Sequence, residues 1–165
     1  MKSVADPKTG VVRAEIEIRA SPSEVFDALT DPAQLEAWWG SDNYYRTKDW
    51  ISELWIGGKR GGIAIGADGK VATVRGEYRA IERPSLIEFT WEASWDDFAS
   101  TLVRAEIYPI PTGTLLKVIH SGFLPGSKSS HGYVQGWGAV LNWLTKYFLR
   151  SAPRVQQNQN EDNVL

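Results

Sequence analysis

The chain has 165 residues, a mass of 18.4 kDa and a formal net charge of −2, which suits one domain with a substantial hydrophobic core. The near balance of 18 basic and 20 acidic residues argues against a nucleic-acid-binding protein, because such proteins normally carry a basic face. The absence of cysteine excludes disulfide frameworks, cysteine nucleophiles and zinc–thiolate sites. Aromatic residues stand out, with 8 Trp, 6 Tyr and 5 Phe, and they suit a large core, a ligand cavity or an interface.

The ends of the chain differ in composition from its middle. Residues 1–10 lack the apolar segment of a secretory signal, and no stretch is apolar enough to span a membrane, so we expect a cytoplasmic protein without membrane insertion. We expect an N-terminal arm at 1–10, a single folded domain at 11–151 and a disordered tail at 152–165, which is polar and amide-rich.

The first elements are a strand and two short helices. Residues 11–19 alternate apolar with charged side chains, which predicts a strand with one buried face. Ser21 precedes a proline and is followed three residues later by Glu24, the pattern of a capping box at a helix start. Asp31, again followed by proline, predicts the start of a second short helix that ends at Gly40.

The middle of the chain reads as a series of antiparallel strands separated by glycine and proline turns. The predicted strands cover residues 51–56, 63–65, 70–81, 85–93, 101–110 and 114–123. The cluster GGKRGG at 57–62 is predicted to be a hairpin turn. It is not a phosphate-binding loop, because no Gly-Lys-Ser/Thr sequence opens a helix there.

The last predicted element is a helix of about 20 residues, from His131 to Ser151. Its apolar stripe consists of Tyr133, Trp137, Val140, Leu141, Leu144 and Phe148. Antiparallel strands need a cover for their apolar face, and this helix is the only predicted element long enough to provide one. We therefore expect an α+β fold in which a curved antiparallel sheet wraps around the long C-terminal helix.

The order of these segments resembles the START-like helix-grip (SRPBCC) superfamily. The segments that carry the resemblance are IEIRASPSEVFDALTDPAQLEAWWG, GEYRAIERPSLIEFTWE, GTLLKVIHSGF and GYVQGWGAVLNWLTKYF. The branch most similar to them is the family named after the C-terminal domain of the activator of the heat-shock-protein-ninety ATPase (AHSA-type). The resemblance implies about six to seven strands around the helix, two short helices after the first strand, and a deep cavity that various members use for lipids, polyketides, hormones or other apolar molecules.

The inward-facing side chains are the predicted ligand-binding residues, with plain core packing as the alternative interpretation of the same set. They are Trp38, Trp39, Tyr78, Phe89, Trp91, His120, Phe123, Tyr133, Trp137 and Leu141. His120 is either a ligand-orienting or acid–base group, or a histidine held by a neighbouring hydroxyl such as that of Tyr78 or Ser121. We predict no catalytic residue, no metal site and no cofactor.

These observations predict a binding protein for a small apolar or aromatic ligand, lipid-like or polyketide-like. Two alternatives stay open: a cyclase- or hydrolase-type enzyme in which Tyr78, His120 and Tyr133 act on a carbonyl, and a co-chaperone-like interaction module that stimulates a chaperone ATPase. Four further aromatic residues either rim the cavity or form a homodimer contact: Trp50, Trp55, Trp95 and Phe98.

Overall fold

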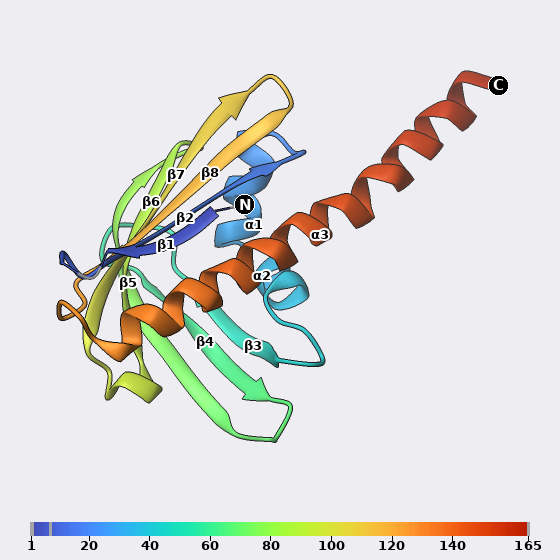
Figure 1. Ribbon diagram of the computed structural model, residues 1–165. Helices are drawn as coiled ribbons and strands as arrows, with labels where there is room; N and C mark the ends of the chain where they lie inside the picture. Colours follow the sequence, from blue (N-terminus) through green and yellow to red (C-terminus); the bar gives the residue numbers. More distant parts are fainter. Residues whose placement is uncertain (1, 7, 165) are drawn as a thin grey trace.

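An antiparallel sheet curves around the long C-terminal helix in this computed structural model (Figure 1). Its eight strands are β1 (Lys2–Asp6), β2 (Val11–Ile18), β3 (Tyr45–Ser52), β4 (Lys59–Gly66), β5 (Val71–Glu82), β6 (Leu86–Ala93), β7 (Ser100–Ile110) and β8 (Gly113–Ser121), in the spatial order β1-β2-β8-β7-β6-β5-β4-β3. The structure describes residues 2–6 and 8–164, without the side chains of residues 3, 5 and 151–164. The predicted α+β helix-grip architecture is confirmed. The predicted N-terminal arm contains an additional strand, β1, which pairs with β2.

The two short helices begin where their caps predict. In α1 (Pro22–Thr30) the Ser21 hydroxyl accepts a hydrogen bond from the Glu24 backbone N–H at 3.2 Å, and the Glu24 carboxylate accepts one from the Ser21 backbone N–H at 3.1 Å. In α2 (Pro32–Trp38) the Asp31 carboxylate accepts from the Ala33 backbone N–H. The two helices follow β2 directly; α1 packs against β7 and β8, and α2 packs against β3 and the long C-terminal helix.

The sheet is bent by irregularities in two of its strands. The register of β3 against β4 shifts between Lys48 and Ile51, where Asp49 has a positive φ of 55°. The register of β5 against β6 shifts between Tyr78 and Ala80. Because an extra residue increases local twist and bend, these shifts turn β3, β4 and the start of β5 away from the rest of the sheet.

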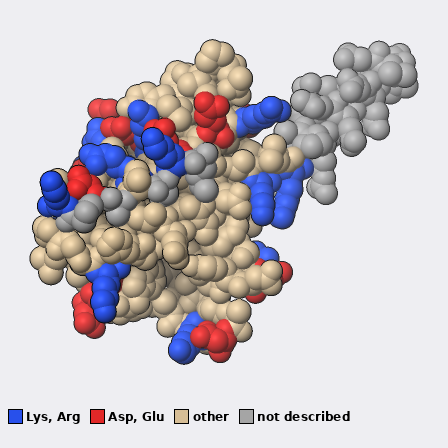
Figure 2. Space-filling view, viewed as in Figure 1, with Lys and Arg blue, Asp and Glu red and all other residues tan. Residues whose placement is uncertain are grey.

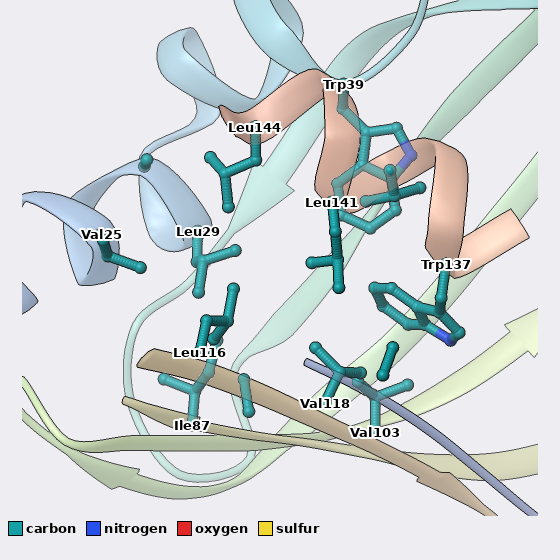
Figure 3. Close-up of a cluster of buried hydrophobic side chains, with 14 of the residues drawn as sticks. Val25, Leu29, Trp39, Ile87, Val103, Leu116, Val118, Trp137, Leu141 and Leu144 are labelled. Atoms are coloured by element: carbon teal, nitrogen blue, oxygen red, sulfur yellow. The ribbon is translucent and has the colours of Figure 1, made fainter. Parts of the chain in front are cut away.

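The long helix α3 (Lys128–Val164) crosses the concave side of the sheet and begins three residues earlier than predicted. Its middle part lies in the core, where Leu141 and Leu144 point toward side chains of α1 and of the central strands (Figure 3). The predicted tail at 152–165 lies outside the residues whose side chains are described. None of the described helices combines the length and hydrophobicity needed to cross a membrane.

The packing of α3 against the central strands predicts a large loss of stability when a core side chain is truncated. Leu144 is fully buried, so Leu144→Ala should lower the free energy of unfolding by about 2–5 kcal/mol. Lys146→Ala, at an exposed position one half-turn away, should change it by less than about 0.5 kcal/mol. Urea unfolding followed by circular dichroism measures both, and equal losses would contradict this placement of α3.

Candidate functional site

A cavity of about 850 Å³ lies between the N-terminal part of α3 and strands β3, β4 and β5. Its aromatic lining consists of Trp39, Tyr44, Tyr45, Trp50, Trp91, Trp95, Tyr133 and Trp137. The volume falls within the range of pockets that enclose small organic molecules, and an aromatic lining is typical of such pockets. In Figure 2 the surface below α3 is largely uncharged, with Lys, Arg, Asp and Glu side chains toward its margins.

Two glycines in the interior of α3 enlarge the cavity from the helix side. Gly132 and Gly136 both line it, and a Cβ atom added to either would meet nothing within 4 Å. No neighbouring backbone approaches these positions, so close packing does not require glycine here. Each glycine destabilises a helix interior by about 1 kcal/mol relative to alanine. The helix therefore bears a cost in stability that leaves space open next to Tyr133 and Trp137.

Small side chains of the sheet enlarge the cavity from the opposite side. Gly62, Ala64 and Gly66 of β4 and Ala72 of β5 line the cavity. The predicted hairpin turn at 57–62 is wrong in extent, because β4 already begins at Lys59. The physical reason is that β4 forms a full ladder with β3 and β5 through its glycines.

The indole N–H groups around the cavity are used by the protein itself. Four of them donate hydrogen bonds: Trp39 to the Tyr45 hydroxyl at 3.1 Å, Trp50 to Thr47 Oγ1 at 2.9 Å, Trp91 to the Tyr133 hydroxyl at 2.8 Å, and Trp137 to His120 Nδ1 at 3.1 Å. Burial raises the pKa of Tyr45 to about 12 and also raises the pKa of Tyr133, so both phenols are neutral at physiological pH. The rings thus offer mainly carbon surface to the cavity.

His120 is fully buried in β8 and hydrogen-bonded on both sides of its ring. Because Nδ1 accepts from Trp137, the network assigns the proton to Nε2, which lies 2.7 Å from Thr101 Oγ1. The Thr101 hydroxyl in turn donates to the Trp91 carbonyl at 2.8 Å. Burial lowers the pKa of His120 to about 3, so the ring is neutral. The histidine is held by Trp137 and Thr101, where the sequence suggested Tyr78 or Ser121.

Arg60 of β4 is a buried cation that the sequence analysis missed. Its Nη1 donates to the Leu29 carbonyl at 2.7 Å and to the Tyr78 hydroxyl at 2.8 Å, while its guanidinium lies 4.2 Å from the Phe89 ring centroid. Leu29 belongs to the last turn of α1, which contains no basic residue of its own. Arg60 therefore supplies positive charge to the negative end of that helix dipole. Its Nε has no hydrogen-bond partner among the described residues.

The structure divides the predicted ligand-binding residues between the cavity and the core. Trp39, Trp91, Tyr133 and Trp137 line the cavity. The other predicted residues are buried beside it, away from its lining: Trp38, Tyr78, Phe89, His120, Phe123 and Leu141. Trp39 and Trp137 stand at the boundary, with ring centroids 5.9 Å apart, and both also border a void of only about 20 Å³ in the core.

The additional aromatic residues have separate locations. Trp50 and Trp95 line the cavity, whereas Trp55 is exposed beyond the end of β3. Phe98 lies under the Arg75 guanidinium, at 3.9 Å from the ring centroid. The sequence analysis missed Tyr44 and Tyr45, which also line the cavity. Their position as an aromatic pair shortly after the second short helix was the signal that could have identified them.

Polar side chains line the cavity at the end formed by the 3-10 helix η1 (Ser94–Asp96) and the start of α3, and also at the turn between β4 and β5, where Asp68 and Lys70 lie. Asp96 of η1 accepts a hydrogen bond from Ser129 Oγ at 2.7 Å and a longer one from the Tyr133 hydroxyl at 3.4 Å. In the part of the chain that the structure describes, no group of three or more His, Asp or Glu side chains is placed to hold a metal ion.

The environment of His120 predicts a specific dependence of stability on pH. Because its folded pKa of about 3 lies below the ordinary value of 6.5, its contribution is full above pH 6.5 and is lost as the pH falls toward 3. Between pH 7 and pH 5 the wild type should lose about 2 kcal/mol more unfolding free energy than His120→Gln. Urea unfolding at both pH values measures this difference, and identical losses would contradict a neutral, buried histidine.

Comparisons with known proteins agree with this architecture. The family model described as Activator of Hsp90 ATPase homolog 1-like protein matches residues 19–149. The fold is similar to that of a protein from Mycobacterium smegmatis, with 18% sequence identity and a TM-score of 0.78, covering 92% of this chain and 98% of that chain. It is also similar to that of the AHSA1 protein from Silicibacter pomeroyi, with 22% identity and a TM-score of 0.75, covering 86% of this chain and 99% of that chain. A third similar fold is that of an AHSA1-like protein from Aeromonas hydrophila, with 19% identity and a TM-score of 0.71, covering 86% of this chain and 94% of that chain. At these identities the likeness shows the fold alone. The search of curated proteins gave no significant match.

Proposed function

The chain belongs to the family of Activator of Hsp90 ATPase homolog 1-like proteins, and we propose that it binds a small, largely apolar or aromatic ligand in the cavity beneath α3. The observation that carries the proposal is the open space at Gly132 and Gly136. Protein atoms make no dispersion contacts across a cavity of this size, and glycine weakens the helix that bounds it. A ligand that fills the space would supply these contacts.

The hydrogen bonds that the cavity's indole groups already make within the protein support a largely apolar ligand. Because Trp39, Trp50, Trp91 and Trp137 donate their N–H groups to protein acceptors, a ligand without polar atoms leaves none of these donors unsatisfied. Ring faces and edges then contribute dispersion and offset-stacking contacts.

The same hydrogen bonds weigh against the enzymatic alternative. Both nitrogens of His120 are occupied and its ring lies outside the cavity lining. The Tyr78 hydroxyl is held by Arg60 Nη1 at 2.8 Å and by Ser52 Oγ at 2.7 Å, also away from the cavity. General acid–base catalysis needs groups within hydrogen-bond reach of the substrate, and of the proposed set only Tyr133 lines the cavity.

A substitution that fills the cavity from the helix side tests ligand binding. Gly136→Phe should place its ring in the open space and weaken binding of the neutral fluorescent probe N-phenylnaphthylamine at least about tenfold. The thermal midpoint should stay the same or rise, because phenylalanine is a better helix former than glycine. Fluorescence titration and thermal unfolding measure the two effects.

Gln135→Phe is the matched control, since it adds the same side chain at an exposed neighbouring position of α3. This variant should bind the probe as the wild type does. If the wild type takes up no probe, or if both variants bind it equally, the cavity is not the binding site and the proposal fails.

The family name supplies a second candidate, stimulation of the Hsp90 ATPase. Exposed apolar side chains at one end of the edge strand β3 favour it, because Ile51, Trp55 and Ile56 are more than half exposed, at 52%, 59% and 63%. If this surface docks on the chaperone, adding the protein should raise the Hsp90 ATPase rate, and Trp55→Ser should reduce the stimulation. An unchanged ATPase rate with the wild-type protein would exclude this candidate.

A further inference from the structure

We propose that the ligand of this cavity carries a cationic amine, which Asp96 and the rings of Trp91, Trp95 and Tyr133 bind at the end of the cavity next to the start of α3. This inference rests on the proposed function and specifies the chemical class of its ligand. All four side chains line the cavity.

The carboxylate of Asp96 retains capacity for a further donor. It accepts hydrogen bonds from Ser129 Oγ at 2.7 Å and from the Tyr133 hydroxyl at the long distance of 3.4 Å. A carboxylate has about four lone-pair sites, so two stay available to a ligand. Among the described residues no basic side chain lies within ion-pair distance of Asp96. Its charge lies next to the positive end of α3 through Ser129, and the amine that we propose would be its ion-pair partner.

The aromatic rings beside Asp96 suit the same ligand group. The Tyr133 ring centroid lies 6.3 Å from that of Trp95 and 6.4 Å from that of Trp91. Faces of such rings attract an ammonium group. Tyr133 also packs against His120 at 4.6 Å and Phe123 at 5.1 Å, so Trp95 is the ring of this set most open to a ligand. Trp95 is 53% exposed although it is among the largest apolar side chains, so core packing does not explain its position at this end of the cavity.

The other charged residues of the cavity leave this assignment unchanged. Asp68 and Lys70 pair with each other at 3.9 Å. Lys128 lines the cavity and is exposed, and it has no ion-pair partner among the described residues. Lys128 precedes Ser129, the hydrogen-bond partner of Asp96, so its role is tested below by substitution.

Three probes with one ring system separate charge from shape. Pyrenylmethylamine is cationic, pyrenylmethanol is neutral and pyrenylacetate is anionic. Fluorescence anisotropy of the pyrene group, at neutral pH and low salt, gives the three dissociation constants with the full chain. The amine should bind about tenfold more tightly than the alcohol, and the acetate should bind more weakly than both.

Substitution of the carboxylate identifies its role. Asp96→Asn keeps the size and the acceptor for Ser129 but removes the charge, so the preference for the amine over the alcohol should disappear while the alcohol binds as before. Asp97→Asn is the matched control, because Asp97 is the exposed next residue and asparagine tolerates its φ of 51°. This variant should keep the full preference. Lys128→Gln should keep or increase it.

The outcomes separate the two proposals. If the wild type binds the alcohol as tightly as the amine, or if Asp96→Asn retains the preference for the amine, the inference about charge is wrong and apolar binding stands. If none of the three probes binds to the wild type, the proposed function fails and the inference fails with it.

Discussion

A single helix has to cover a concave sheet that is much wider than the helix. Strands lie about 4.8 Å apart, so the eight strands described here extend over roughly 34 Å, whereas a helix with its side chains is about 10–12 Å across. The helices α1 and α2 fill part of the difference next to the middle of α3. Strands β3 to β5 bend away from the N-terminal part of α3, and the cavity occupies the space between them.

The tryptophans at the boundary between core and cavity keep that space from collapsing. The ring centroids of Trp39, Trp91 and Trp137 lie 5.9 to 6.2 Å from one another, and each indole N–H is bonded to a separate part of the protein. A large ring fixed by both packing and a hydrogen bond has few alternative rotamers. Arg60 stabilises the neighbouring core, because its guanidinium donates hydrogen bonds both to the Leu29 carbonyl at the end of α1 and to the Tyr78 hydroxyl. The wall of the cavity is therefore part of the hydrophobic core.

Local signals of the sequence were sufficient for most of the fold. The caps at Ser21 and Asp31, the alternation of β6 and β8, and the helical stripe of α3 each depend on neighbouring residues, and each predicted the element that the structure contains. The cavity, in contrast, exists because small residues leave side-chain atoms out of the space between α3 and the sheet. Glycines add nothing to a pattern of hydrophobic periodicity, so the sequence does not reveal that space. For this reason residues 57–62, which include the first part of β4, were interpreted as a hairpin turn, and the inward position of Arg60 was missed. The division of the aromatic residues between core and cavity arises from the bends in β3 and β5, which alternation alone does not predict.

The chemistry of the cavity follows from where its polar groups find partners. Along the tryptophan-lined wall the indole donors are directed into the protein, so a ligand bound as proposed would be selected there mainly by size and shape. A methylene more or less in such a wall changes affinity only modestly. In the proposed binding mode, selectivity would therefore depend on the end of the cavity where hydrogen-bonding capacity is left over. That end is at Asp96, because η1 and the start of α3 bring a carboxylate, a phenol and two indole rings together without a neutralising cation in ion-pair contact among the described residues.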